Sequence, residues 1–317
     1  MKNFLEFEKE IKEIDLKIEE MHKFSEEKNI DLTAEITKME QEAKAKLKEI
    51  YAGLTVWQKV SVARHMERPY TLDYIKNMCD DFVELHGDRL FRDDPAIVGG
   101  TGTIGGKSFI IIGHQKGRDI NSNLYRNFGM ANPEGYRKAL RLMKMAERFN
   151  LPILTLVDTA GAYPGLEAEE HGQGEAIARN LMEMAGLKVP VFSVIIGEGG
   201  SGGALALAVA NRVYMMEYSV YSVISPEGCA AILYKDASKA ADAADKLKID
   251  GQNLLKMGVI DSIIKEPVGG AHRDHKEAAE NIKKVILKEY EVLSTLTKEQ
   301  LVEQRYEKFR KLGHFAE

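Results

Sequence analysis

The hydrophobic positions along the chain follow two different periods, and the first belongs to helices. Among many Lys and Glu residues, apolar side chains recur at a three-four spacing, first over residues 11–21 and again over residues 36–50. Each set places one apolar stripe on a helix. The polar residues 25–31 separate the stripes, so the pattern predicts an antiparallel helical hairpin. One stripe is too narrow for a core of its own, and we expect the hairpin to pack on the body or on another subunit.

From residue 97 the pattern changes to the two-residue period of strands. Residues 97–113 predict two strands joined at Gly105-Gly106, because both central positions of a hairpin turn can take positive φ there. Helix-length segments then alternate with short apolar strands, which predicts parallel pairing with right-handed crossovers and hence an α/β fold. The expected elements are helices over 133–149 and 169–185 and strands over 153–157, 191–196 and 213–217.

Helical patterns flank these strands on both sides. Thr55 is placed to cap a helix over residues 56–67, and Thr71 begins another. A last helical region covers residues 271–312. We therefore expect an N-terminal helical hairpin or arm over residues 1–68, and an α/β domain with C-terminal helices over residues 69–317.

Composition narrows the choice of partners and location. The 317 residues carry a net charge of -5, without the basic bias that nucleic-acid binding requires. No apolar run approaches the roughly 18 residues that span a bilayer, and Met1 leads into a charged helix rather than a signal peptide, so we expect a cytoplasmic protein without membrane contact. Only Cys79 and Cys229 are present, which excludes a disulfide framework and a four-cysteine zinc ribbon; we expect both to be buried or half-buried.

Five glycines crowd residues 197–203, directly after a predicted strand. Gly197, Gly199 and Gly202 match the dinucleotide pattern G-x-G-x-x-G, and Glu217 stands where a ribose-binding acid is expected. However, only residues 203–211 separate the last of these glycines from the next strand, and a crossover helix usually needs more. No Lys-Ser or Lys-Thr follows the glycines, so the nucleotide-phosphate loop is excluded as well.

A strand that ends in glycines at a helix start can instead form an oxyanion hole. The first-turn amides have no partner within the helix, and glycine lets a carbonyl oxygen approach them. A second such turn follows the strand over 153–157, where Gly161 or Ala162 would supply another amide. The alternative is that both stretches are tight turns without chemistry, since glycine also has purely conformational uses.

Three segments carry a specific resemblance. Residues 158–165 (DTAGAYPG), 197–204 (GEGGSGGA) and 223–230 (VISPEGCA) resemble the carboxyltransferase alpha subunits of bacterial acetyl-coenzyme A carboxylase. Those subunits belong to the crotonase-like (ClpP/crotonase) superfamily, whose fold is a superhelix of repeated ββα units. The resemblance covers nearly the whole chain, including the motifs ELHGDRL at 84–90 and GGAHR at 269–273.

The resemblance implies a biotin-dependent transferase. Such an alpha subunit, with a beta subunit, moves the carboxyl group from carboxybiotin on the biotin carboxyl carrier protein to acetyl-CoA and forms malonyl-CoA, the first committed step of fatty acid biosynthesis. Biotin carboxylase is the further partner. The expected assembly has two alpha and two beta subunits, with zinc in the beta partner and no metal in this chain.

The resemblance also assigns roles to the glycine loops. Gly202 and Gly203 would form the oxyanion hole for biotin, with Gly161 and Ala162 beside them. No protein base is required, because the biotin nitrogen can take the proton from the acetyl methyl group. The chain departs from the family pattern at His171 and Gly174. The substrate-binding residues implied are Tyr163, Pro164, Gly165, Gly199, Gly200, Ser201 and Glu227.

Alternatives remain open at this point. A hydratase of the same fold needs two carboxylates, and only Glu227 stands near the glycines, where it is equally an acid in the helical turn capped by Ser225. The other two alternatives are a carboxyltransferase subunit that acts on propionyl-CoA and a non-catalytic assembly protein. Arg118 and Arg126 are candidates to meet coenzyme A phosphates or the carrier. We expect structural or solvent roles for His86, His114, His272 and His275.

Overall fold

The computed structural model describes residues 3–313, so the predicted domain limits at Met1 and Glu317 lie outside the described residues. Its centre is an eight-stranded sheet in the order β1-β2-β3-β4-β5-β6-β8, with β7 pairing with β5. The strands are β1 (Asp81–Glu84), β2 (Ile97–Ile104), β3 (Lys107–His114), β4 (Ile153–Thr159), β5 (Val191–Gly200), β6 (Arg212–Met216), β7 (Val220–Ser222) and β8 (Ser262–Ile264).

Pairing in the sheet agrees with the two-residue pattern of the sequence. β1, β2 and β3 pair antiparallel, and the β2–β3 turn has positive φ at Gly105 and Gly106 (56° and 76°), as predicted. From β3 to β8 all neighbours are parallel, which confirms the expected α/β arrangement. β5 pairs with β6 through residues 192–195 and with β7 through residues 198–200, so its glycine-rich end continues beyond β6.

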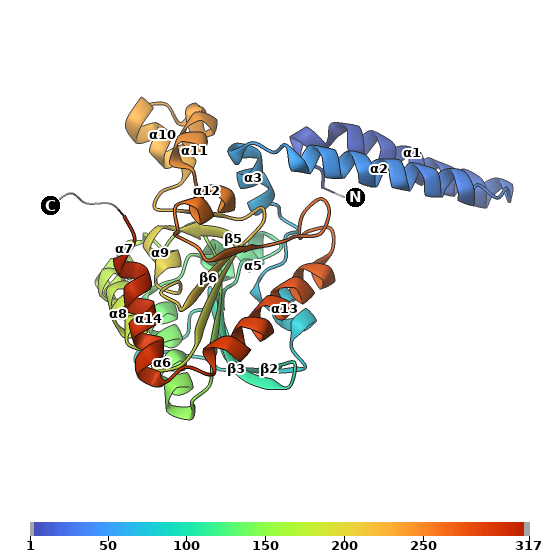
Figure 1. The fold of residues 1–317 in the computed structure, drawn as a ribbon. Coiled ribbons are helices and arrows are strands. Elements are labelled where there is room, and N and C mark those ends of the chain that lie inside the picture. The colour runs from blue at the N-terminus through green and yellow to red at the C-terminus, as the bar shows by residue number, and fades with distance from the viewer. Residues whose placement is uncertain (1–2, 314–317) are drawn as a thin grey trace.

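Helices cover both faces of the sheet (Figure 1). α4 (Thr71–Met78) and α13 (His275–Leu293) pack on one face against residues such as Leu154 and Leu156. α6 (Pro133–Phe149) and α8 (Gln173–Ala185) pack on the other, against Ile153 and Val157, and α14 (Lys298–Arg310) lies on α8. Alternate residues of β4 thus enter opposite cores, and every residue of the strand is buried.

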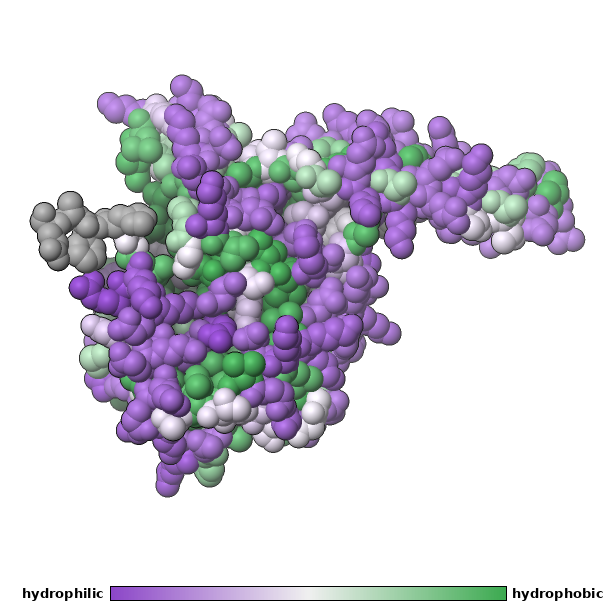
Figure 2. Space-filling view, in the orientation of Figure 1, coloured by the Kyte–Doolittle hydropathy of each residue, from purple (hydrophilic) through white to green (hydrophobic). Residues whose placement is uncertain are grey.

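The N-terminal hairpin projects from the body as α1 (Lys9–Lys28) and α2 (Thr33–Ala52), which confirms that prediction (Figure 1). Figure 2 shows a mostly hydrophilic surface on this arm. The stripe residues Ile11 and Leu47 cluster with Tyr218 of the body. No helix among residues 3–313 combines the length and apolar character needed to cross a membrane.

α3 (Val56–Ala63) is capped by Thr55, whose hydroxyl accepts from the Gln58 amide, but it ends before the predicted residue 67. Its residues Val60 and Ala63 pack against Val220 and Ile249 of the body. The division of the chain at residue 68 stays a prediction.

Three predicted elements differ from the structure. The helix over 169–185 is divided into α7 (Leu166–Glu170) and α8, because Gly172 takes a left-handed conformation (φ 81°). The C-terminal helical region is likewise two helices, with Thr297 capping the second. β5 extends through the glycines to Gly200, which leaves only five residues for α9 (Ser201–Leu205).

Several short elements lacked a clear signal in the sequence. They are η1 (Glu6–Glu8), α5 (Ile120–Tyr125), η2 (Asn127–Gly129), η3 (Ala237–Lys239), α11 (Ala240–Leu247) and α12 (Gly251–Lys256). The helix α10 (Pro226–Tyr234) follows Ser225, the cap expected from the sequence.

A fully buried ion pair joins the segment after α3 to the segment after β8. Arg68 Nη1 and Nη2 contact the two carboxylate oxygens of Glu266 at 2.9 and 2.6 Å, and both side chains are 0% exposed. The Arg68 Nε donates to the carbonyl of Ile196 in β5 (2.6 Å). This pair therefore fixes the approach of the N-terminal segment to the sheet.

We expect Arg68→Met to lower the free energy of unfolding by about 3–5 kcal/mol, because it leaves the Glu266 carboxylate buried without its cation. The double variant Arg68→Met/Glu266→Gln should regain part of that loss. Urea denaturation of the three proteins tests this, and a single variant within about 1 kcal/mol of wild type would contradict it.

Candidate functional site

The two glycine-containing loops lie against each other at one edge of the sheet. β4 and β5 are parallel neighbours, so their carboxyl ends meet there. A Cβ atom on Gly203 would lie 2.5 Å from the amide nitrogen of Ala162 and 2.6 Å from the carbonyl carbon of Gly161. A Cβ on Gly200 would collide with the carbonyl of Ala160. The loops are therefore packed backbone to backbone, at a distance that only glycine permits.

The turn from β5 into α9 presents first-turn amides. Ser201, Gly202 and Gly203 are the first three residues of α9, whose amides have no acceptor within the helix. The left-handed residue of the turn is Ser201 (φ 51°) rather than a glycine, and its side chain is exposed. Such strained residues gather at functional sites. Since α9 has only five residues, the turn offers amides rather than the dipole of a long helix.

An apolar cavity opens beside these amides. Its volume is about 510 Å³. Ser201 and Gly202 form part of its wall, so a molecule in the cavity reaches the first turn of α9. The remaining wall comes from Leu205, Ala208, Val213, Tyr221, Ser222, Val223, Leu247, Ile249, Leu254, Val259, Phe309 and Leu312.

The second loop is held by its own hydrogen bonds. The Gly161 amide donates to Thr159 Oγ1 (3.1 Å), and that hydroxyl donates to the Gly161 carbonyl (2.6 Å). The Tyr163 amide donates to the carbonyl of Ala131, before α6 (3.0 Å). Of the two amides considered from the sequence, Gly161 is thus engaged within the loop, and Ala162 is the one that lies against Gly203.

The other expected binding residues border the same edge. The Tyr163 ring packs over Gly165, which precedes α7. Gly199 and Gly200 pair with β7 opposite Tyr221 and Ser222. Pro164 follows Tyr163 in the loop, before α7.

Sequence reasoning missed a charged cluster under the loops. Lys116 Nζ lies 2.6 Å from Asp158 Oδ1 and 3.5 Å from Glu198 Oε2, and the Glu198 amide donates to Asp158 Oδ1 (2.9 Å). The cluster joins the carboxyl ends of β3, β4 and β5. Burial alone would lower the pKa of Lys116, but Asp158 and Glu198 raise it above its usual value, so the ammonium stays charged. The only available signal was that Lys116 and Asp158 each come soon after a predicted strand, over residues 97–113 and 153–157.

Arg64, directly after α3, binds two carboxylates beside the glycine turn. Its Nε contacts Glu198 Oε1 at 2.6 Å, and its Nη1 contacts Glu227 Oε1 at 2.5 Å. Burial tends to raise the pKa of both carboxyl groups. Lys116 and Arg64 nevertheless hold the pKa of Glu198 below its usual value, and Arg64 holds the pKa of Glu227 below its usual value. Two carboxylates are therefore present, as a hydratase would need, but both are paired with Arg64.

The Ser225 cap expected at the start of α10 is present, because the Ser225 hydroxyl accepts from the Gly228 amide (3.1 Å). Glu227 therefore belongs to the first turn of α10, and its side chain also forms the ion pair with Arg64.

The two candidate phosphate-binding arginines are engaged elsewhere. Arg118 Nη1 donates to the carbonyls of Met66 (2.6 Å) and Arg68 (2.9 Å), and Arg126 Nη1 donates to the carbonyl of Pro95 (2.7 Å). These bonds anchor the segment between β3 and α6 on its neighbours.

Three histidines lie away from the glycine edge in ordinary contacts. His86 contacts Asp93 at 3.1 Å, His275 contacts the carbonyl of Glu67 at 2.8 Å, and His272 stacks on His65 with ring centroids 3.9 Å apart. Within residues 3–313, no group of three or more His, Cys, Asp and Glu side chains could hold a metal ion. Cys79 is half-buried and Cys229 buried, as predicted.

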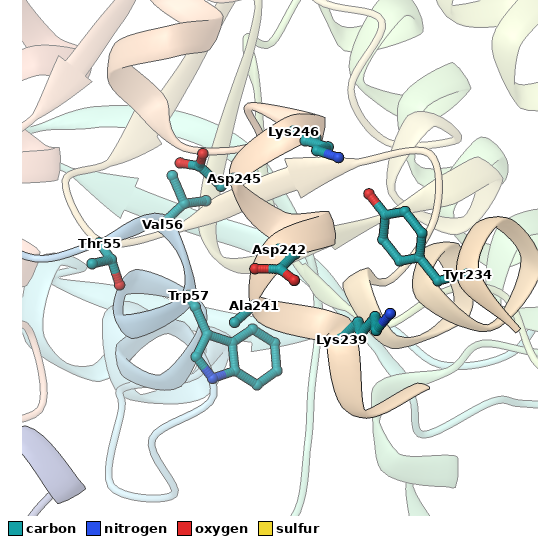
Figure 3. Close-up of a pocket in the computed structure, with 9 residues that line it drawn as sticks. All are labelled: Thr55, Val56, Trp57, Tyr234, Lys239, Ala241, Asp242, Asp245 and Lys246. Carbon is teal, nitrogen blue, oxygen red and sulfur yellow. The ribbon is translucent and has the colours of Figure 1, made fainter. Parts of the chain in front are cut away.

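A second cavity lies apart from the glycine loops, between α3 and the α10–α11 pair (Figure 3). It measures about 600 Å³, and Trp57, Tyr234 and Lys246 are among the side chains that line it. Its lining includes no residue of either glycine loop, and we assign it no part in the site.

His114 lies fully buried at the end of β3, against the backbone of Gly203. Burial lowers its pKa to about 3, and the Gly203 backbone opposes that shift only in part. Neither ring nitrogen makes a hydrogen bond within the described residues. The ring is thus a neutral support beneath the glycine turn, in line with the structural role expected from the sequence.

This burial predicts a pH dependence of stability. As the pH falls through about 6.5, the unfolded chain protonates His114 while the folded chain does not, so this group alone removes about 2 kcal/mol of stability between pH 7 and 5. His114→Gln should lose that part of the pH dependence, whatever its stability at pH 7. Urea denaturation at both pH values measures it. An unchanged difference between pH 7 and pH 5 in the variant would show that the histidine titrates normally in the folded protein.

Comparisons with known proteins agree with this geometry. Residues 4–313 match the family model described as "Acetyl co-enzyme A carboxylase carboxyltransferase-like". The acetyl-coenzyme A carboxylase carboxyl transferase subunit alpha of Fusobacterium nucleatum is 63% identical over 98% of this chain and 99% of the relative, and that of Geobacter metallireducens is 58% identical over 99% and 98%.

Solved structures show the fold at lower identity. A transcarboxylase 12S structure superposes with a TM-score of 0.58 at 18% identity, over 74% of this chain and 44% of that one. The beta subunit of P. aeruginosa geranyl-CoA carboxylase superposes with a TM-score of 0.58 at 16% identity, over 78% of this chain and 46% of that one. The expected crotonase-like carboxyltransferase fold is thereby confirmed. With the family match over nearly its whole length, the chain belongs to the carboxyltransferase alpha subunits of acetyl-coenzyme A carboxylase.

Proposed function

We propose that the glycine edge of the sheet is the centre of carboxyl transfer, where the amides of Gly202 and Gly203 hold the urea oxygen of biotin and the Ala162 amide lies beside them. One observation carries the proposal: two loops packed backbone to backbone present first-turn amides to an apolar cavity. The fold and family membership make the chain an acetyl-CoA carboxyltransferase subunit of fatty acid biosynthesis, but they do not locate its site.

The residues at this edge fit a carrier-borne biotin. Biotin supplies an activated carboxyl group, and the oxygen of its urea gains negative charge as that group departs. Amides fixed in advance stabilise such charge strongly, because they need not reorganise during the reaction. Leu205, Tyr221 and Val223 supply apolar walls against the bicyclic ring and limit the access of water.

The chain's contribution is binding and orientation rather than proton transfer. Glu198 and Glu227 stay ionised on Arg64, so neither is free to act as an acid. Lys116 holds Asp158 and Glu198 together, which fixes the ends of β4 and β5 where the loops begin. Of the other expected binding residues, Tyr163, Pro164 and Gly165 would border the substrate from the second loop, and Gly199, Gly200 and Ser201 from the first.

As an alpha subunit, the chain works in a biotin-dependent complex with a beta subunit and other carboxylase components. We further propose two copies of each subunit, zinc in the beta partner, carboxybiotin delivered by the biotin carboxyl carrier protein after biotin carboxylase, and a cytoplasmic location. Acetyl-CoA is the acceptor, with the thioester oxygen held by the partner.

The first test is reconstitution. The chain alone should form no malonyl-CoA from carboxybiotin and acetyl-CoA, because it offers amides for one of the two oxygens that become negative. Adding the beta subunit should restore transfer, measured as labelled carboxyl in malonyl-CoA. Full activity of the isolated chain would overturn the division of roles.

The second test compares a glycine of the proposed site with one outside it. Gly203→Ala should lower turnover on the order of a hundredfold, because its methyl group would force the two loops apart and misplace the amides. Gly186→Ala is the matched control, since Gly186 lies at the end of α8, outside both glycine loops, and its Cβ would meet only the Glu183 carbonyl at an ordinary 3.8 Å, so turnover should change little. The transfer rate of the reconstituted complex measures both.

Thermal melting and binding of the beta subunit separate loss of function from loss of fold. A Gly203→Ala complex that assembles, melts normally and turns over at the wild-type rate would remove the glycine turn from the site.

A further inference from the structure

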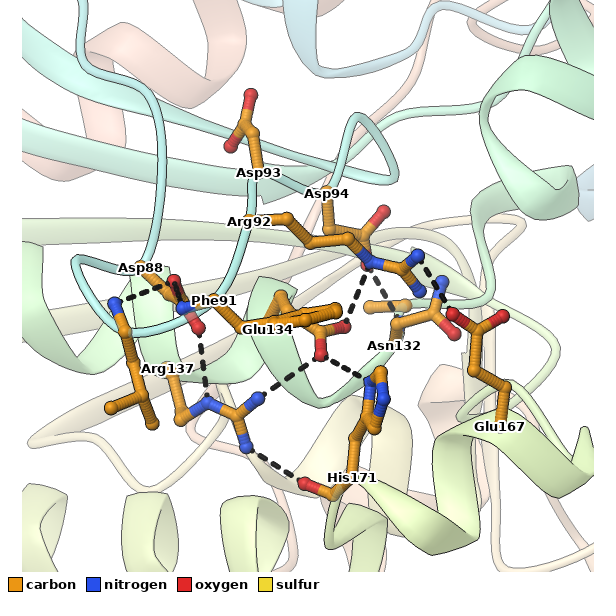
Figure 4. A network of polar contacts seen from close by, with 12 residues as sticks. Asp88, Phe91, Arg92, Asp93, Asp94, Asn132, Glu134, Arg137, Glu167 and His171 are labelled. Atoms are coloured by element: carbon orange, nitrogen blue, oxygen red, sulfur yellow. Dashed lines mark hydrogen bonds and ion pairs between the residues drawn. The ribbon is translucent and has the colours of Figure 1, made fainter.

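A buried polar network lies at the start of α6 (Figure 4). It joins three segments: the residues between β1 and β2, the first turn of α6, and the α7–α8 junction. At its centre is Glu134, whose side chain is 0% exposed although it carries a carboxylate. The reaction proposed above gives this carboxylate no role.

Glu134 contacts all three segments. Its Oε1 accepts from Arg137 Nη2 at 3.1 Å and lies 2.9 Å from His171 Nδ1, and its Oε2 lies 3.6 Å from Arg92 Nε without a hydrogen bond. Arg92 in turn reaches Glu167 of α7 (2.8 Å), and Arg137 donates to the carbonyl of His171 (2.9 Å). Figure 4 shows these side chains converging on the carboxylate.

α7 depends on this network for its position. Of its five residues, only Ala168 is buried, so apolar packing alone holds the helix weakly. The contacts of Glu167 and His171, one in α7 and one at its end, attach the helix to α6 and to Arg92. The network therefore replaces the missing hydrophobic contact with charge-assisted hydrogen bonds, which have stricter geometry.

The position of α7 is transmitted to the second glycine loop. Residues 158–165 lead directly into α7, so this loop is fixed at one end by β4 and at the other by α7. Gln173, at the start of α8, donates through Nε2 to the carbonyls of Ala131 and Tyr163, both at 2.9 Å. Across the loop, Ala162 lies against Gly203.

We propose that Glu134 is a positioning residue for carboxyl transfer: through His171, Arg137 and Arg92 it fixes α7, and through α7 it sets the loop that packs on Gly203. The inference rests on the proposed function, since the loop matters to turnover only if the glycine edge is the site. Glu134 itself touches no reacting atom.

Glu134→Gln tests the proposal with the smallest change of shape. The amide keeps an oxygen that can accept from Arg137, but it removes the charge that holds two arginines and a histidine. We expect amide hydrogen exchange in residues 159–172 of the alpha–beta complex to rise about tenfold. We expect kcat for carboxyl transfer to fall on the order of tenfold, with KM for acetyl-CoA unchanged within about twofold, because small misplacement of binding groups slows the reaction step.

Glu183→Gln is the matched control. Glu183 in α8 also binds two cations, Lys144 at 2.7 Å and Arg179 at 3.0 Å, but neither contact reaches α7 or the glycine loops. Its loss of charge should leave hydrogen exchange in residues 159–172, kcat and KM at wild-type values. An equal effect in both variants would mean that general electrostatics, and not the Glu134 contacts, is responsible.

A second variant covers the case in which Glu134→Gln does not fold. Arg92→Ala removes a partly exposed partner (39% of its side chain) and leaves Glu134 with Arg137 and His171. It should still raise exchange in residues 159–172, by a smaller factor, because Glu167 loses its contact.

The combined results separate the two claims. Faster exchange with slower turnover supports both. Faster exchange with unchanged turnover keeps Glu134 as the support of the loop but removes the loop from the reaction, which contradicts the proposal and the proposed function together. Unchanged exchange in folded Glu134→Gln and Arg92→Ala complexes overturns the positioning role alone, whatever the proposed site does.

Discussion

The structure depends on one close contact, the backbone packing between residues 160–162 and residues 200–203. The two main chains meet directly at Gly200 and Gly203, where a Cβ would overlap the opposite main chain. Backbone groups at such a contact have little freedom to move, so their amides are fixed before any ligand arrives. Preorganised amides are what stabilises a developing oxyanion best.

Residues around the two loops hold that contact in place. Parallel pairing brings the ends of β4 and β5 together, and Lys116 binds the acids Asp158 and Glu198 at those ends. Neutral His114 fills the space under Gly203. Arg64 adds a link from the segment after α3, so the base of the N-terminal arm also reaches the glycine edge.

Local patterns in the sequence predicted much of this arrangement. The helical hairpin, the β2–β3 turn and the parallel strands follow from periodicity and turn residues over short distances. The glycine loops were recognisable because their spacing after apolar strands is itself a local signal, and the family resemblance turned that signal into a reaction. The break between α7 and α8 was missed, because it needs a left-handed Gly172 within an otherwise helical pattern.

The charged residues of the site were not predictable in the same way. Arg64 and Glu198 are 134 positions apart, and Lys116 and Asp158 are 42 apart. Glu134 looks like an ordinary acid in the first turn of a helix, where acids are common. Only the fold shows that it is buried and that it binds His171, at the end of α7. Such roles come from long-range contacts, for which a single sequence carries no periodic signal.

A structure of the alpha–beta complex with a biotin ester bound would test the glycine site most directly. The urea oxygen should lie within about 3.2 Å of the amide nitrogens of Gly202 and Gly203, as a hydrogen bond requires, with the ring in the apolar cavity beside Leu205. A biotin ring bound elsewhere in a fully active complex, with the glycine turn unoccupied, would contradict it.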